Sequence, residues 1–213
     1  MAAVTGATGV FGGAFDPPHV GHVELARRGI EHFRLDRLLV LVVADPGHKG
    51  VATAPQIRLR LAELAFGRLE GAEVALDTHA RTVDSLLTLG LDDPIFLIGA
   101  DEFASFPTWT APERVLELAR LGVATRPGVD TARLEAVRAT LARPERVEFF
   151  AIEPLPVSSS DIRARLGRGL SVDGLLPPAV AAEIARHGLY AHVDRAGGGG
   201  MLGDDRTEGT TQT

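Results

Sequence analysis

Short runs of β-branched and leucine residues alternate along the chain with longer segments in which apolar residues recur every three or four positions. The short runs predict strands over residues 8–12, 37–44, 72–76, 94–99, 121–125 and 147–152. The longer segments predict crossover helices over residues 20–33, 56–69, 83–89, 112–119 and 131–142. This alternation is typical of βαβ units, so we predict an α/β fold, a Rossmann-like parallel sheet with helices on both faces.

Two further helical stretches follow the last predicted strand, over residues 159–166 and 178–187. The second begins with Pro177-Pro178, and proline is tolerated in a first helical turn. We expect these stretches to form a small C-terminal helical cap that completes a single domain over residues 1–193. Residues 194–213 are rich in glycine and polar side chains, too poor in apolar groups to pack, and we expect a disordered C-terminal tail.

Composition narrows the classes of protein that the chain could represent. Its 213 residues are 45% apolar, enough for one domain with a sizeable core. The net charge is −6 and no block of Lys or Arg is present, so we expect no nucleic-acid partner. Without cysteine, the chain forms no disulfide and no cysteine zinc site. The most apolar run, residues 38–44, is too short to span a membrane and no signal pattern precedes it, so we expect a cytoplasmic protein that does not bind membranes.

The candidate chemistry lies in the loops that follow the predicted strands. In an open parallel sheet, ligands bind outside the carboxyl ends of the strands, where the strand order reverses. Four of these loops carry unusual residues. Their shared location indicates one binding site more strongly than any single motif.

The first of these loops has features of a phosphate site. Gly12-Gly13 allows the backbone close to a ligand, and Asp16-Pro17-Pro18 suits the start of a helix with proline in its first turn. His19 and His22 are three residues apart in the opening turn, so both imidazoles should share one face near the positive end of the helix dipole. We expect Gly21 to leave the space between the two rings open.

Other interpretations of this region have weaker support. The two histidines could be ordinary surface residues, or a zinc pair, although Glu24 is not in an HExxH arrangement. Upstream, the segment from Thr5 to Gly12 matches the TGxxGxxG fingerprint of short-chain dehydrogenases, yet too few residues precede it to form a strand. The Tyr-x-x-x-Lys pair of that family is also impossible here, because the only tyrosine is Tyr190 and the only lysine is Lys49.

From about residue 10 to residue 190 the chain resembles the nucleotidyltransferase superfamily with the HxGH motif and, within it, the nicotinate-nucleotide adenylyltransferases. The resemblance rests on the motifs GGAFDP (12–17), HVGH (19–22), GAD (99–101), FPTW (106–109), RPG (126–128) and VSSSDIR (157–163). It implies a nucleotidyltransferase domain that joins the adenylyl group of ATP to nicotinate mononucleotide, giving deamido-NAD and pyrophosphate in NAD biosynthesis. The alternatives are a sibling enzyme with another acceptor, such as nicotinamide mononucleotide or phosphopantetheine, and a catalytically silent nucleotide-binding homologue.

On the ATP side, the resemblance implies catalytic roles for His19, His22, Lys49 and Arg163, and ATP contacts for Gly12, Gly13, Ala14, Phe15, Gly99, Asp101, Ser158, Ser159 and Ser160. The residues themselves agree with parts of this assignment. Ser158 to Ser160 suit a helix start whose hydroxyls cap backbone N–H groups, with Arg163 one turn later, although a plain N-cap with a solvated arginine is the alternative. Lys49 is the single lysine among 22 basic residues, which favours a phosphate contact over an exposed loop position. The family usually has two prolines before His48, where this chain has Pro46-Gly47.

On the acceptor side, we expect pyridine-nucleotide contacts for Arg81, Thr82, Trp109 and Arg126. Composition alone would put Trp109 in the core, whereas the resemblance has it stack on the pyridine ring. Arg126 is expected at the mononucleotide phosphate, with a surface position before the Pro-Gly turn as the alternative. Arg81-Thr82 replaces the usual Tyr-Thr, and we hypothesise that Arg81 favours the acid over the amide, unless it points to solvent.

For Asp101, which follows Gly99, we expect hydrogen bonds to ribose hydroxyls or a helix N-cap role. The mononucleotide phosphate is already an anion near neutral pH, so the reaction requires cations and N–H donors rather than a strong base. We expect Mg²⁺ to arrive on the triphosphate, with no metal site built by the protein. The sequence makes no prediction of oligomeric state.

Overall fold

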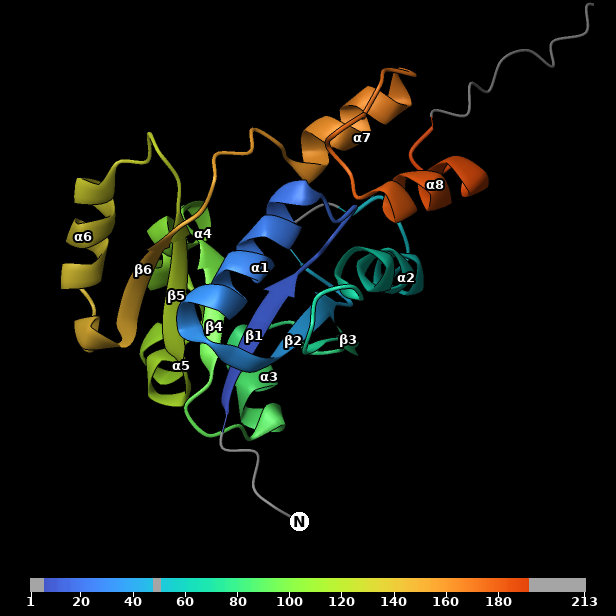
Figure 1. The fold of residues 1–213 in the computed structure, drawn as a ribbon. Helices are drawn as coiled ribbons and strands as arrows, with labels where there is room; N and C mark the ends of the chain where they lie inside the picture. The colour runs from blue at the N-terminus through green and yellow to red at the C-terminus, as the bar shows by residue number, and fades with distance from the viewer. Residues whose placement is uncertain (1–5, 48–50, 192–213) are drawn as a thin grey trace, which may run out of the picture.

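A computed structural model describes residues 6–47 and 51–191 of the chain. Its centre is a parallel sheet with the strand order β3-β2-β1-β4-β5-β6 (Figure 1). The strands are β1 (Ala7–Gly13), β2 (Leu35–Val43), β3 (Ala72–Asp77), β4 (Ile95–Gly99), β5 (Arg120–Thr125) and β6 (Val147–Ala151). Val10 of β1 lies between Leu39 of β2 and Phe96 of β4. The predicted parallel α/β sheet is therefore confirmed, and the strand order reverses beside β1.

Helices cover both faces of the sheet and enclose two apolar cores (Figure 1). One core is formed by the sheet with α1 (Val20–Phe33), α2 (Pro55–Phe66), α7 (Ser159–Gly167) and α8 (Pro178–His187). The other is formed with α3 (Thr82–Leu89), α4 (Ala100–Ser105), the 3₁₀ helix η1 (Phe106–Thr108), α5 (Pro112–Leu118) and α6 (Thr131–Ala139). A second 3₁₀ turn, η2 (Pro144–Arg146), precedes β6. Within the described residues, no helix is long and apolar enough to cross a membrane.

The main departure from the predicted elements is α4 with η1, which the sequence did not indicate. Residues 100–108 show no apolar period long enough to predict a helix, yet Phe103 and Phe106 are fully buried and pack against each other. Tertiary burial therefore decides the conformation here. Elsewhere the boundaries shift by a few residues: the second predicted helix ends at Phe66 instead of residue 69, and the fifth ends at Ala139 instead of residue 142.

The two C-terminal helices form the expected cap beyond the carboxyl end of β1 (Figure 1). The backbone N–H of Val20, the first residue of α1, donates to the carbonyl of Leu175 before α8, at 3.1 Å. The cap thus contacts the start of α1, which is the loop predicted to bind phosphate. Residues 194–213 and Lys49 lie outside the described residues, so the domain limits remain a prediction.

Candidate active site

The carboxyl ends of the strands surround a cleft of about 1420 Å³. It lies where the strand order reverses, the place at which open parallel sheets bind ligands. The predicted site residues that the structure describes all line it: Gly12, Gly13, Ala14, Phe15, His19, His22, Arg81, Thr82, Gly99, Asp101, Trp109, Arg126, Ser158, Ser159, Ser160 and Arg163. Lys49 and His48 lie outside the described residues.

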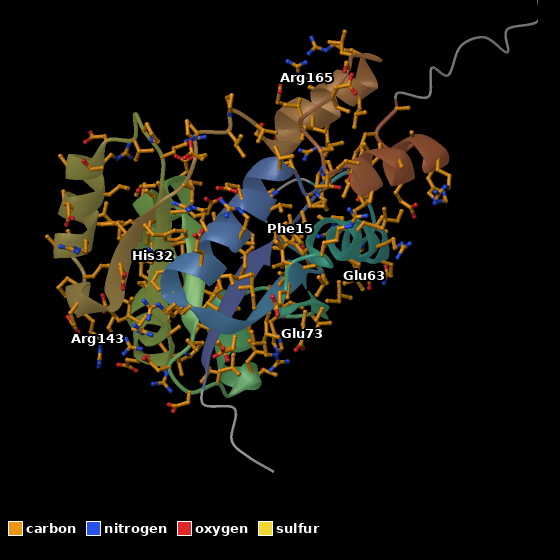
Figure 2. The ribbon with its side chains drawn as sticks, in the orientation of Figure 1. Phe15, His32, Glu63, Glu73, Arg143 and Arg165 are labelled. Atoms are coloured by element: carbon orange, nitrogen blue, oxygen red, sulfur yellow. The ribbon has the colours of Figure 1, made fainter. Side chains whose placement is uncertain are left out.

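The floor of the cleft at the end of β1 is set by Gly13 and Phe15. A Cβ atom at Gly13 would lie 2.8 Å from the Phe15 ring, too close for any residue but glycine. Phe15 is buried between α1 and α2 (Figure 2). Its backbone has a left-handed conformation with φ 50°. Its ring lies edge-on to that of His22, with centroids 5.2 Å apart. The Phe15 ring therefore packs against His22, and the backbone of this loop lines the cleft, where a ligand can approach it.

The two histidines cap α1 reciprocally. His19 is the N-cap: its Nδ1 accepts the backbone N–H of His22 at 3.4 Å, and His22 Nδ1 accepts that of His19 at 3.2 Å. The rings stack with centroids 3.6 Å apart. Because each Nδ1 is an acceptor, each neutral imidazole carries its proton on Nε2. The pair therefore provides N–H donors at the positive end of a helix.

Two expectations about this turn were wrong. Pro17 and Pro18 precede the N-cap and are not in the first turn. No open space separates the stacked rings; instead, a Cβ atom at Gly21 would lie 3.1 Å from Val157 and 3.2 Å from His19, so Gly21 gives room to these neighbours. Burial also lowers the pKa of His19 to about 4, so this imidazole is neutral near pH 7.

The serine-rich segment and Arg163, at the start of α7, lie next to the histidine turn. Ser158 is the N-cap, its Oγ accepting the N–H of Asp161 at 3.1 Å. Ser159 Oγ instead donates to the carbonyl of Pro17 at 2.8 Å, which holds α7 against the histidine turn. Arg163 donates to Ser160 Oγ at 3.3 Å. Helices α1 and α7 therefore direct their N-termini and one guanidinium at the same part of the cleft.

On the other side of the cleft, the structure places the residues expected to contact the acceptor. Trp109 is half-buried, packs edge-on against Phe106 with centroids 5.3 Å apart, and reaches the cleft surface. Arg126 pairs with Asp101 at 3.6 Å. Asp101 is not an N-cap, since Gly99 has that position and Asp101 lies in the first turn of α4. Arg81, the N-cap residue of α3, is exposed and lines the cleft.

The structure also shows polar groups at this edge that the sequence analysis did not assign. Arg58 of α2 is fully buried and donates to four carbonyls, those of Ala14, Val43, Ala44 and Thr53, at 2.7–3.3 Å. The sequence could have indicated this role, because helical spacing puts Arg58 on the same face of α2 as the buried residues Leu61 and Ala62. Its guanidinium fixes the segments that follow β1 and β2.

At the end of β3, Asp77 is buried and accepts from the N–H of His79 at 2.9 Å and from Ser85 Oγ at 2.6 Å. His79 Nδ1 also contacts Asp77 at 2.9 Å, and its Nε2 lies 3.1 Å from Thr88 Oγ1. This network secures the loop that carries Arg81 and the start of α3.

The dehydrogenase interpretation is wrong. Within the described residues, the glycines of the TGxxGxxG match lie in or next to β1, and Gly9 and Gly12 pair with Leu38 and Leu41 of β2. That fingerprint requires a loop between a strand and a helix, and this segment is a strand.

This chain is similar to known proteins in sequence and in fold. The cytidylyltransferase-like family matches residues 10–165. Probable nicotinate-nucleotide adenylyltransferases from Bordetella avium and Pseudomonas paraeruginosa are each 38% identical to this chain, and each match covers 85% of this chain and 96% of the relative. The relative of the same name from Thermomicrobium roseum is 36% identical, with 87% and 92% covered.

A solved structure described as Plasmodium falciparum nicotinic acid mononucleotide adenylyltransferase complexed with APC has the same fold, with a TM-score of 0.66 and 16% identity. The match covers 87% of this chain and 97% of that one. From the family match and the identity with the bacterial relatives, this chain belongs to the cytidylyltransferase-like family and, within it, to the nicotinate-nucleotide adenylyltransferases.

Proposed function

We propose that this chain transfers the adenylyl group of ATP to nicotinate mononucleotide, forming deamido-NAD and pyrophosphate. The observation that carries the proposal is the composition of the cleft's two sides. The capping histidines and Arg163 supply N–H donors at one side, and the aromatic ring of Trp109 with Arg126 lies at the other. A triphosphate fits the first environment, and a pyridine ring with a phosphate fits the second. The names of the bacterial relatives support the same pair of substrates.

In the proposed reaction, an oxygen of the mononucleotide 5′-phosphate forms a bond to the α-phosphorus of ATP. The bond between that phosphorus and the oxygen bridging to the β-phosphate breaks, and pyrophosphate leaves with the electron pair. The attacking phosphate is already anionic near neutral pH, so no proton must be removed. The protein's task is to hold two polyanions in line and to stabilise the charge that moves onto the leaving oxygen.

His19, His22 and Arg163 are the described residues suited to that task. The capping bonds occupy Nδ1 of each imidazole, which puts the proton of each neutral ring on Nε2, and these Nε2–H groups are the proposed donors to phosphate oxygens. Burial keeps His19 neutral near pH 7, and it therefore acts as a donor that takes up no proton. Arg163 supplies permanent charge. We propose that Lys49, which follows β2 in sequence, adds a second permanent charge.

A divalent metal ion fits this site as a companion of ATP. No group of three or more His, Asp or Glu side chains in the described part of the chain could hold a metal by itself. The cleft wall at α1 and α7 offers N–H donors, which repel a cation but bind phosphate oxygens. We therefore propose that Mg²⁺ enters on the triphosphate, held by phosphate oxygens and water, and supplies charge neutralisation there. A requirement for cellular ATP and the absence of cysteine support a cytosolic location for this activity.

The experiment that tests the proposal measures pyrophosphate release from ATP and Mg²⁺ on adding each acceptor separately. We expect release with nicotinate mononucleotide, accompanied by deamido-NAD. Faster release with nicotinamide mononucleotide or phosphopantetheine would assign a sibling activity. No release with any acceptor, from protein that still binds ATP, would mean a silent homologue.

A further inference from the structure

Asp16 is a buried carboxylate that the proposed chemistry does not use. Its side chain is 2% exposed, beneath the turn that carries His19 and His22. Oδ1 accepts from Thr53 Oγ1 at 2.6 Å and from the Tyr190 hydroxyl at 2.8 Å. Oδ2 accepts from the backbone N–H of Ala52. Both oxygens are therefore engaged by the protein itself.

These contacts join segments that are far apart in the sequence. Thr53 lies just before α2, and Tyr190 follows α8, 174 residues after Asp16. Burial raises the pKa of Tyr190, so its hydroxyl remains a hydrogen-bond donor at any working pH. The only tyrosine of the chain thus fixes the C-terminal cap to the loop after β1.

Asp16 also touches a residue of the proposed ATP site. Its backbone carbonyl accepts from Arg163 Nη1 at 2.7 Å, and the same nitrogen lies 4.0 Å from Oδ2. Arg163 Nη2 donates to Ser160 Oγ. The Asp16 carbonyl and Ser160 Oγ therefore orient the guanidinium plane, and Arg163 lines the cleft with its remaining N–H groups. Arg58, itself buried, supplies another positive charge near Asp16.

We infer that Asp16 is a positioning residue for adenylyl transfer: anchored by Tyr190, Thr53 and Ala52, it holds Arg163 in the orientation that receives the triphosphate. This inference rests on the proposed function and adds that the C-terminal cap sets the geometry of the ATP site. A displacement of about 1 Å in a positioned group is enough to cost about 100-fold in rate. The Tyr190 hydroxyl therefore affects catalysis through Asp16 and Arg163, although it does not contact substrate.

The test compares Tyr190→Phe, Arg163→Ala and the double variant with the unsubstituted protein. Tyr190→Phe removes one donor to Oδ1 and leaves the ring packed. We expect it to lower kcat/KM for ATP about fivefold to tenfold, and to change KM for nicotinate mononucleotide less than twofold. Asp16→Asn removes one acceptor oxygen and the negative charge beside Arg163. We expect this variant to lower kcat/KM for ATP about 100-fold.

Coupling to Arg163 distinguishes positioning from simple support of the fold. In the Arg163→Ala background, we expect Tyr190→Phe to have less than a twofold further effect on the Kd of a non-hydrolysable ATP analogue, measured by calorimetry, and on kcat/KM for ATP. Val147→Ala, a buried position at the start of β6 and far from Asp16 in the fold, is the control for lost stability. It should lower Tm without changing KM for ATP.

Equal effects of Tyr190→Phe in both backgrounds would overturn the inference, as would parallel changes in the KM values of both substrates. Measurements on the unsubstituted protein distinguish failure of this inference from failure of the proposed function. If it releases no pyrophosphate with any acceptor, the proposed function fails, whereas ATP-analogue binding still decides whether Tyr190 and Arg163 are coupled.

Discussion

The imidazoles of His19 and His22 stack with ring centroids 3.6 Å apart, and each Nδ1 accepts the backbone N–H of the other residue. The arrangement satisfies the first N–H groups of α1 and fixes the tautomer of both rings. Protonating His19 would put a proton on its Nδ1 and break a capping bond. The helix start and burial therefore keep His19 as a neutral imidazole with an Nε2–H donor, the form that the proposed reaction needs.

Stability should therefore depend on pH through His19. Its pKa is about 4 in the folded protein and 6.5 in the unfolded chain, so between these values the unfolded state binds a proton that the folded state does not. The free energy of unfolding should fall by up to about 3 kcal/mol as the pH drops from about 6.5 to about 4. His19→Asn keeps an N-cap acceptor without this titration and should show a shallower decline. Urea unfolding at a series of pH values measures both, and equal declines would contradict the assignment.

Mononucleotide binding should be visible through Trp109, the only tryptophan of the chain. Stacking on a pyridine ring should quench its fluorescence when nicotinate mononucleotide is added, and ATP alone should have a much smaller effect. Trp109→Phe should raise KM for the mononucleotide about tenfold, with little change in KM for ATP. Unchanged fluorescence at saturating mononucleotide, in protein that turns over, would remove Trp109 from the acceptor site.

Preference for the acid over the amide should depend on Arg81. A partly solvated charge pair is worth about 1 kcal/mol, so Arg81→Gln should lower kcat/KM for nicotinate mononucleotide about fivefold and leave that for the amide nearly unchanged. Arg186→Gln on α8 also removes an exposed arginine charge, outside the cleft lining, and is the matched control. If Arg81→Gln lowers kcat/KM equally for the acid and the amide, the Arg81 side chain does not recognise the carboxylate.

Lys49 should be protected by ATP. As the single lysine, it gives a lysine-specific protease only one cleavage site, between residues 49 and 50. We expect ATP with Mg²⁺ to slow this cleavage several-fold, and nicotinate mononucleotide alone to leave the rate unchanged. A cleavage rate that does not depend on ATP would place Lys49 outside the phosphate site.

The sequence predicted the parts of the site that depend on local motifs and on the geometry of a parallel sheet. His19, Arg126 and Ser158 follow different strands, and parallel strands bring their carboxyl ends to one edge, so their meeting in one cleft could be expected. The exact start of α1 could not, because histidine is not a usual N-cap and the preceding prolines suit a first turn.

The supporting network could not be predicted, because it joins distant parts of the chain. Nothing near Asp16 indicates that Tyr190 will reach it, since the contact depends on how α8 packs over α2. Arg58 was accessible to sequence reasoning in principle, as a charge on an otherwise apolar helix face. Its four carbonyl partners come from three separate segments, and only the folded chain brings them together.

The most direct test of the account is the turnover number of His22→Ala with saturating ATP, Mg²⁺ and nicotinate mononucleotide. If the stacked imidazoles stabilise charge on the leaving oxygen, kcat should fall about 100-fold to 1000-fold while far-UV circular dichroism and a cooperative unfolding transition persist. Near-normal kcat in this folded variant would contradict the claim that these N–H donors carry the reaction.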